Sequence, residues 1–227
     1  MPASSKVYIE KGSKRVFAGA LDWPGWCRGG SDEDAALDAL IAYGPRYARA
    51  MRAVKPAFRP PRSPSALTVV ERLKGDATTD FGAPSIAPAA DARKIDSLEL
   101  VRLQALLKAT WRALDRAADQ AAGVTLRKGP RGGGRDLDAI LNHVAGAETA
   151  YVRRLAAKPP NLDEDHAAAA AKEIRRAVLD ALTSAVTEGL PKEGPRGGRI
   201  WLPRYFVRRT AWHALDHAWE IEDRSTP

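Results

Sequence analysis

The chain has 227 residues, of which 44% are hydrophobic and 28% are charged, and its formal net charge at pH 7 is +8. This composition is that of a globular protein and excludes a wholly disordered chain. The single cysteine, Cys27, excludes an intrachain disulfide framework, and no apolar run approaches the roughly 18 residues of a membrane helix. The first residues lack the apolar segment of a signal peptide, so we expect a cytoplasmic protein with no membrane partner.

The N-terminal part combines strand and helix patterns in chain order. Residues 6–10 and 15–21 are rich in β-branched and aromatic side chains and flank a glycine–serine turn, which predicts a hairpin. After a tight loop and two glycines, Ser31 is the expected N-cap of an amphipathic helix that should end before Pro56. Residues 66–73 predict a further strand. Together these segments indicate a small α+β module.

A stretch without periodicity separates this module from the rest of the chain. It is rich in Gly, Pro, Ala, Ser and Thr, and Phe81 is its one large apolar side chain, which we expect to anchor it. We therefore divide the chain into an α+β domain at 1–80, a linker at 81–96 and a helical domain at 97–227.

The helical domain shows four amphipathic helices. A capping signature at 96–99 opens the first, and apolar residues at steps of three and four then continue to a glycine-rich loop at 127–135. The same spacing of apolar residues predicts a second helix that ends at two prolines, 159–160, and a third helix over 163–188. A fourth helix is expected to begin at Pro203. Four such helices in about 130 residues predict a four-helix bundle, so the expected fold class is α+β.

The chain has four histidines. His213 and His217 lie four residues apart, so they share one face of the last helix, beside its apolar stripe. His143 lies on the second helix of the bundle at the edge of its stripe, and the three imidazoles can converge across the bundle. His166 lies in an acidic, polar stretch, and we interpret it as solvated.

Three buried imidazoles need partners, and a divalent metal satisfies all three at once. Three histidines plus a water are typical of a catalytic zinc site, in which a bound water ionises near pH 7 and a bound thiol loses its proton. An all-histidine set suits zinc, nickel, copper and iron alike. The carboxylates expected to orient the ligands are Glu148, Asp216 and Glu220. The alternative is that these histidines are structural groups of the core.

A short internal repeat marks two basic loops. Gly-Pro-Arg-Gly-Gly occurs at 129–133 and again at 194–198, each time just before a helix that carries histidine. Glycine-rich backbone and helix N-termini attract anions. The candidate anion- or substrate-binding residues are Arg127, Arg131, Arg135, Arg196, Arg199 and Arg204. The alternatives are solvated loops without a ligand and contacts to the phosphates of nucleic acid.

Cys27 lies between Trp26 and Arg28, and a neighbouring cation favours the thiolate. No histidine is close to it in the sequence. We therefore interpret Cys27 as a structural residue and not as a nucleophile.

The segments around the three histidines resemble a known family. Leu-Asn-His-Val-Ala-Gly-Ala-Glu at 141–148 and Arg-Thr-Ala-Trp-His-Ala-Leu-Asp-His-Ala-Trp-Glu at 209–220 are similar to the DinB/YfiT-like superfamily of four-helix-bundle metalloproteins, over residues 97–224. The resemblance implies that the three histidines bind a divalent metal. It also implies low-molecular-weight thiols, such as mycothiol or bacillithiol, as co-substrates of S-transferases or thiol-dependent isomerases.

The N-terminal part resembles the HicB-like antitoxin domains in the stretch Ala-Leu-Asp-Trp-Pro-Gly-Trp at 20–26, followed by Gly30 and a helix from Asp32. Those domains are small α+β modules. Trp23 stands where an aliphatic residue is usual, and no helix-turn-helix tail follows. The resemblance therefore favours a lid or a dimerisation sheet, and with it a homodimer, over an antitoxin.

We expect a divalent-metal-dependent transferase, with zinc as the first choice of metal, that acts with a low-molecular-weight thiol or another anionic small molecule. The net charge of +8 keeps a nucleic-acid-binding or regulatory module, with a structural or vestigial metal site, as the alternative. A third hypothesis is an interaction protein whose site no longer binds metal.

Overall fold

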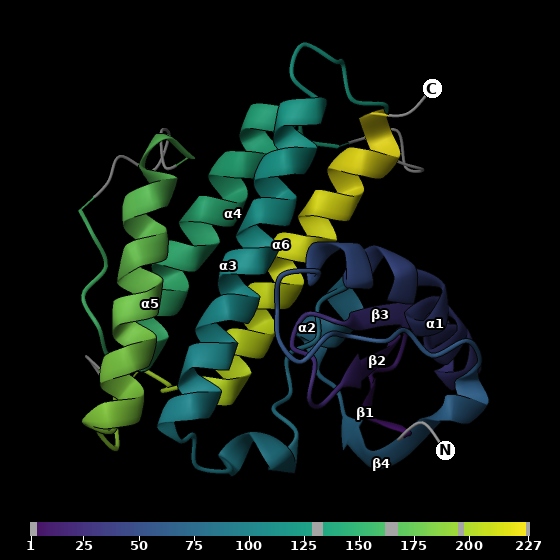
Figure 1. Cartoon of the computed structure of the whole chain (residues 1–227), viewed down its shortest axis with the longest axis horizontal. Helices are drawn as coiled ribbons and strands as arrows, with labels where there is room; N and C mark the ends of the chain where they lie inside the picture. The colour runs from purple at the N-terminus through teal and green to yellow at the C-terminus, as the bar shows by residue number, and fades with distance from the viewer. Residues whose placement is uncertain (1–3, 129–133, 162–167, 195–197, 226–227) are drawn as a thin grey trace.

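The computed structural model describes residues 4–128, 134–161, 168–194 and 198–225 of the chain. A four-stranded sheet with a long helix forms the N-terminal part, and four helices packed side by side form the C-terminal part (Figure 1). The expected α+β class is confirmed. No helix in the described segments is both long and apolar enough to cross a membrane.

The strands of the sheet have the spatial order β3-β2-β1-β4. They are β1 (Ser5–Lys11), β2 (Val16–Ala20), β3 (Cys27–Gly30) and β4 (Leu67–Lys74). β1 pairs antiparallel with β2, as the expected hairpin requires, and parallel with β4, which follows a helical crossover. β2 is buried along its whole length, whereas β4 at the edge alternates between half-buried and exposed residues.

β3 was not predicted from the sequence, which showed only a tight loop and two glycines in this part of the chain. Two of its four residues are glycines, which are depleted in strands, so its sequence carries no strand pattern. It forms because its backbone pairs antiparallel with β2. Gly30 is needed where the next helix begins, since a Cβ at this position would lie 2.4 Å from the backbone nitrogen of Ala36.

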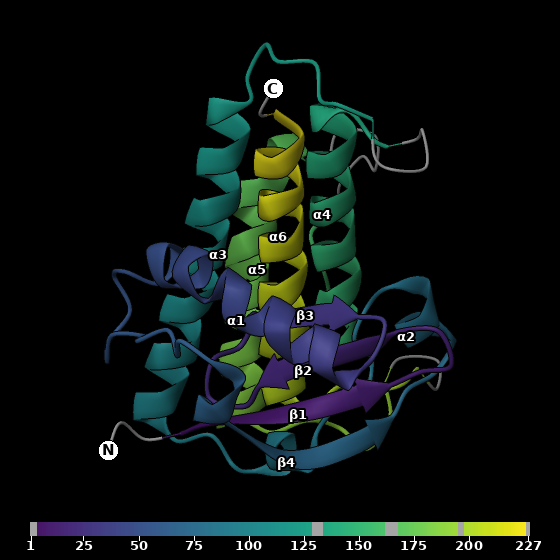
Figure 2. The ribbon, with the colours of Figure 1, turned by 90° about the vertical axis from the view of Figure 1, so that its right-hand side faces the viewer.

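Helix α1 (Glu33–Ala50) packs on the sheet (Figure 2). Its N-cap is Asp32, whose carboxylate accepts a hydrogen bond from the Ala35 N–H at 2.9 Å. The assignment of the cap to Ser31 was therefore wrong by one residue, and the Ser31 hydroxyl hydrogen-bonds to Asp32 instead. The helix ends before Pro56, as expected.

A short helix, α2 (Ala77–Phe81), lies where no regular structure was expected. Asp76 and Thr79 form a capping box at its start. The expectation that Phe81 anchors this segment was wrong, because its side chain is 88% exposed. A buried carboxylate holds the segment instead: Glu10 of β1 accepts hydrogen bonds from the Thr79 hydroxyl and from two backbone N–H groups further along the chain.

Four long helices form the C-terminal bundle. They are α3 (Ser97–Gln120), α4 (Leu137–Val152), α5 (Ala171–Thr187) and α6 (Pro203–Ser225). Asp96 accepts the Glu99 N–H at 2.8 Å, as the capping signature predicts. α5 begins later than the expected residue 163, and residues 162–167 lie outside the described segments. Short 3-10 helices connect these elements, among them η1 (Pro64–Ala66), η2 (Ala89–Ala92) and η3 (Arg153–Leu155).

α6 joins the two parts of the molecule. Phe17 of β2 meets Trp212 of α6 edge to face, with ring centroids 6.2 Å apart. Arg208 forms a buried ion pair with Asp91 at 2.6 Å, and its guanidinium also donates to the carbonyl oxygen of Ala20 at the end of β2. One apolar core runs from the sheet through α1 into the bundle. The boundaries of the two domains therefore stay a prediction.

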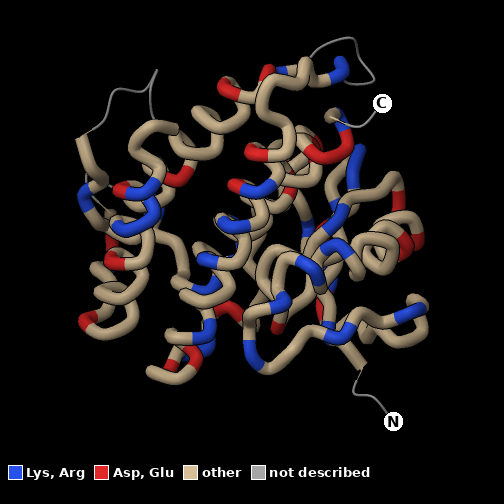
Figure 3. Tube along the Cα trace, turned by 45° about the horizontal axis from the view of Figure 1, so that its top comes forward, with Lys and Arg blue, Asp and Glu red and all other residues tan. Residues whose placement is uncertain are grey.

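The positive net charge is not gathered on one part of the molecule. Along the described segments, Lys and Arg are interspersed with Asp and Glu in both the sheet module and the helices (Figure 3). Net charge by itself thus does not mark one face for an anionic partner, and local clusters of cations decide where an anion could bind.

Replacing Arg208 by Met is expected to lower the free energy of unfolding by about 3–5 kcal/mol, because Asp91 would stay buried without its ion-pair partner. Urea denaturation at neutral pH, followed by circular dichroism, measures the difference. Arg176→Met, at an exposed position of α5, is the matched control and should change the stability by less than about 0.5 kcal/mol. A loss below about 1 kcal/mol for Arg208→Met would contradict the role given to the pair.

Candidate metal centre

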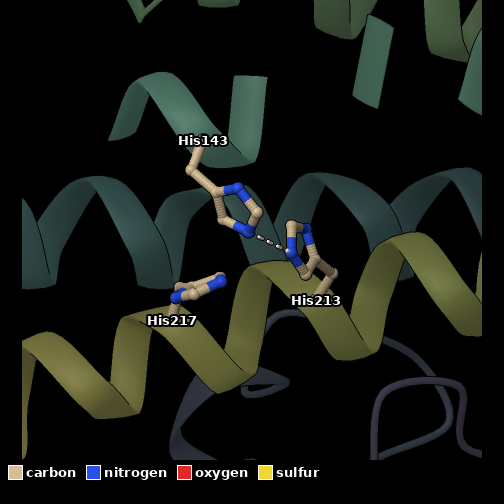
Figure 4. Close-up of side chains that lie close together, drawn as sticks. All are labelled: His143, His213 and His217. Carbon is tan, nitrogen blue, oxygen red and sulfur yellow. Dashed lines mark hydrogen bonds between the residues drawn. The ribbon is translucent and has the colours of Figure 1, made fainter. Parts of the chain in front are cut away.

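Three histidines from two helices of the bundle lie together, with their rings turned towards one another (Figure 4). α6 supplies His213 and His217, which the helical period places on one face, one turn apart. α4 supplies His143, and the side chain of Asp136 fixes the start of this helix by capping the Ala139 N–H. The convergence that the spacing predicts is present.

The rings are close enough to share one ligand. His143 Nε2 and His213 Nε2 lie 3.2 Å apart, and one ligand atom from each of the three histidines lies within 4.8 Å of the others. Two nitrogens bound to one zinc ion in a tetrahedral site, each at about 2.0–2.1 Å, lie about 3.3 Å apart. The facing pair of nitrogens therefore already has the spacing of two metal ligands.

Glu220 lies behind one of the rings. Its Oε2 is 2.8 Å from Nδ1 of His217, and its other oxygen accepts a hydrogen bond from Arg224 at 2.6 Å. The hydrogen bond with His217, and more weakly that with Arg224, lower the pKa of Glu220. Because the Glu220 carboxylate hydrogen-bonds to Nδ1 of His217, the other ring nitrogen, Nε2, can coordinate a metal. This is the usual arrangement of metal-binding histidines. Arg224 was not predicted, although its spacing of four residues from Glu220 is a visible signal.

Burial keeps two of the imidazoles neutral. Desolvation lowers the pKa of His143 to about 4, with the charges of His217 and Arg135 as further causes. Desolvation also lowers the pKa of His213 well below its usual value. Both rings therefore offer a lone pair at neutral pH, as a metal ion requires. Within the described part of the chain, Nδ1 of His213 is buried without a hydrogen-bond partner.

The other two expected carboxylates have partners elsewhere. Asp216 pairs with Arg28 of β3 at 2.7 Å, and the Arg28 guanidinium lies 3.9 Å from the centre of the Tyr43 ring. Glu148 is buried on α4 and accepts a hydrogen bond from Nε1 of Trp111 at 2.6 Å. Among the described residues, neither carboxylate hydrogen-bonds to one of the three histidines. Asp216 thus joins α6 to the sheet, and Glu148 joins α4 to α3.

Of the six arginines expected to bind an anion, the four that the structure describes do not form one group. Arg131 and Arg196 lie outside the described residues. Arg127 donates to a carbonyl oxygen near the end of α6. Arg204 is buried and pairs with Glu99, so its charge is already neutralised. These contacts stabilise the fold at both ends of α6.

Arg135 and Arg199 stay candidates for anion binding. Arg135 is close enough to the histidines for its charge to lower the pKa of His143 and His213. Arg199 lines a cavity with Tyr151, whose ring centroid lies 6.0 Å from that of His213. From the sequence, Tyr151 is predicted to be part of the apolar stripe of α4 and not of the site. Its place beside His213 depends on how α4 packs against α6, for which the sequence has no signal.

Cys27 and His166 do not contribute to the centre that the structure describes. Cys27 is buried next to Phe17 and Trp212, and burial raises the pKa of its thiol to about 12. The thiol is therefore protonated at neutral pH, in agreement with the structural role expected for it. His166 lies outside the described residues.

Comparison of the chain with protein-family models, with curated proteins and with solved structures gave no match. The resemblances to the DinB/YfiT-like and HicB-like families therefore stay predictions.

Glu148→Gln should make the stability less dependent on pH. Burial raises the pKa of Glu148 from 4.5 to about 7, so its contribution to stability is fully present below pH 4.5 and is lost as the pH rises through 7. The loss corresponds to about 3 kcal/mol. Urea denaturation at pH 4.5 and pH 8 should show a smaller difference for the variant, because neutral Gln still accepts the Trp111 N–H. The same pH dependence in both proteins would contradict the assignment.

Proposed function

We propose that the chain binds one divalent metal ion at His143, His213 and His217 and acts as a metal-dependent transferase with a low-molecular-weight thiol or another anionic small molecule. One observation carries the proposal: three imidazoles converge, two with facing Nε2 atoms 3.2 Å apart and the third oriented by Glu220. Two facing ring nitrogens can share only one proton, and the third ring already has Glu220 as its hydrogen-bond partner. A metal ion would satisfy all three rings at once.

The donor set supports a reactive centre. Three neutral imidazoles would leave a bound divalent ion its full charge, so it would lower the pKa of a bound water towards about 7 and hold a bound thiol as the thiolate. Two side chains of the chain support this chemistry. Glu220 orients His217 and fixes its tautomer, and Arg135 places positive charge beside the rings, which attracts an anionic substrate. Zinc is the metal we favour because three protein ligands and one open position are its usual catalytic arrangement. The thiol rests on the DinB/YfiT-like resemblance, and the homodimer on the HicB-like resemblance.

The purified, untagged protein should contain about one equivalent of divalent metal by inductively coupled plasma mass spectrometry, and His213→Ala should contain less than about a tenth of one. Glu220→Gln keeps all three ligands, so it should weaken metal binding by about 10–100-fold in competition with a chelator. A full equivalent of metal in His213→Ala would overturn the site.

Arg176→Gln, on the exposed face of α5, is the control and should keep the metal. If the parent chain holds no metal after purification, and none after reconstitution with zinc, nickel, iron or copper, the proposed function fails. With metal bound, loss of free thiol from mycothiol or bacillithiol in the presence of 1-chloro-2,4-dinitrobenzene tests the transfer itself. His213→Ala should lose that activity.

Nucleic-acid binding is a second candidate function, and one surface feature favours it. A cavity of about 700 Å³ lies at the seam between α1, α3 and α6. The arginines that line it are Arg46, Arg49, Arg52 and Arg116. Arg46 is paired with Glu222 and Asp223, whereas the other three have no ion-pair partner among the described residues. Unpaired arginines in one groove fit phosphate oxygens.

If this seam binds nucleic acid, a labelled DNA of about 20 nucleotides should bind at low salt, and the logarithm of its binding constant should fall linearly with the logarithm of the salt concentration. The double variant Arg49→Gln, Arg116→Gln should reduce the slope by about 2, one for each phosphate contact. Arg176→Gln should leave both affinity and slope unchanged. Fluorescence anisotropy measures both quantities, and absence of binding to DNA and RNA at low salt would remove this function.

A further inference from the structure

A cavity of about 800 Å³ lies where α4 ends, between η3 and the segment that leads into α6. Its volume is in the range of cavities that hold small molecules. The large side chains that line it are Tyr151, Arg153, Arg154, Lys158, Arg199 and Trp201. Of these, only Arg199 was a candidate from the sequence.

The lining of this cavity is positively charged. Four of the lining residues are cations, and within the described part of the chain no Asp or Glu lines it or pairs with them. Backbone contacts hold two of the cations in place: the Arg154 carbonyl accepts the Trp201 N–H at 2.8 Å, and Arg154 Nη1 donates to the Arg199 carbonyl at 3.4 Å. Cations gathered without a counter-charge repel one another, and a bound anion relieves that repulsion.

The walls between the cations are apolar and partly aromatic. The rings of Tyr151 and Trp201 lie 5.0 Å apart, and Tyr205 meets Trp201 edge to face at the same distance. Alanines and Pro159 complete the apolar lining. Such walls fit a flat organic body better than a hydrated inorganic ion.

One side chain connects this cavity with the histidine centre. Tyr151 lines the cavity, and its ring centroid lies 6.0 Å from that of His213. A molecule seated against Tyr151 is therefore one side chain away from the candidate metal ligands.

We propose that this cavity binds a planar organic anion as the substrate of the histidine centre. Arg154, Lys158 and Arg199 hold the carboxylate or sulfonate of that anion, and its conjugated or aromatic body packs on Trp201 and Tyr151. The role as substrate rests on the proposed function, whereas the binding of the anion does not.

Two fluorescent probes with the same ring system separate charge from shape. 1-Anilinonaphthalene-8-sulfonate carries a sulfonate, and N-phenyl-1-naphthylamine lacks it. The sulfonate should bind the full chain saturably at one site, and the neutral probe at least about ten-fold more weakly. Arg154→Gln and Arg199→Gln should each weaken binding of the sulfonate by about ten-fold, the loss of one charge-assisted contact, and leave binding of the neutral probe unchanged.

Trp201→Leu should weaken both probes by a similar factor, because it removes the flat wall and no charge. Arg176→Gln is the control and should bind both probes as the parent does. Equal affinity for the two probes, binding of the sulfonate that does not saturate, or unchanged binding in both cavity arginine variants would overturn the proposal. Thermal unfolding of each variant verifies that it is folded.

Metal content separates this inference from the proposed function. His213→Ala should lose its metal and still bind the sulfonate probe. If the parent binds no metal but the probe depends on Arg154 and Arg199, the proposed function fails and the anion site stands. If the parent binds metal but the affinity for the sulfonate probe is the same in both arginine variants, the metal centre stands and the anion site fails.

Discussion

The burial of α6 on several sides is the constraint on which the rest of this structure depends. One side of the helix fills the bundle, and another meets the sheet through Trp212 and the buried Arg208–Asp91 pair. A helix held in this way cannot turn or slide without opening the core and breaking that pair. The positions of His213 and His217 are therefore set by contacts that do not involve the histidines.

Without a ligand, the histidine centre lowers the stability of the fold. Two of its rings are desolvated, which lowers the pKa of His143 and His213, and their facing nitrogens compete for one proton. An apolar side chain in the place of His213 would fill the same space without this cost. Imidazoles that oppose the stability of the core point to a ligand, and the ionised Glu220 held by Arg224 favours a cation.

Periodicity predicted the long elements well, because their burial follows from the spacing of residues within one helix or strand. Periodicity did not predict the short elements β3 and α2. β3 carries two glycines and exists only because β2 offers a free edge, and α2 is followed by a segment that the buried Glu10 holds. Phe81 shows why burial of a single apolar residue is also hard to predict. A large apolar residue outside a periodic pattern does not indicate whether another surface packs against it, and no described residue covers the exposed Phe81 side chain.

The sequence by itself determined the α+β class, the long helices and the shared face of His213 and His217, since each depends on spacing within one element. Only the tertiary structure decided that Asp216 pairs with Arg28 and that Glu148 meets Trp111, whereas Glu220 lies beside His217 because three residues separate them on one helix. Neighbouring residues of a helix point about 100° apart, so closeness in sequence does not place two side chains in one site. The cavity beside Tyr151 likewise exists only because the end of α4 and η3 lie against the segment that leads into α6, and such distances between elements follow from packing and not from spacing along the chain.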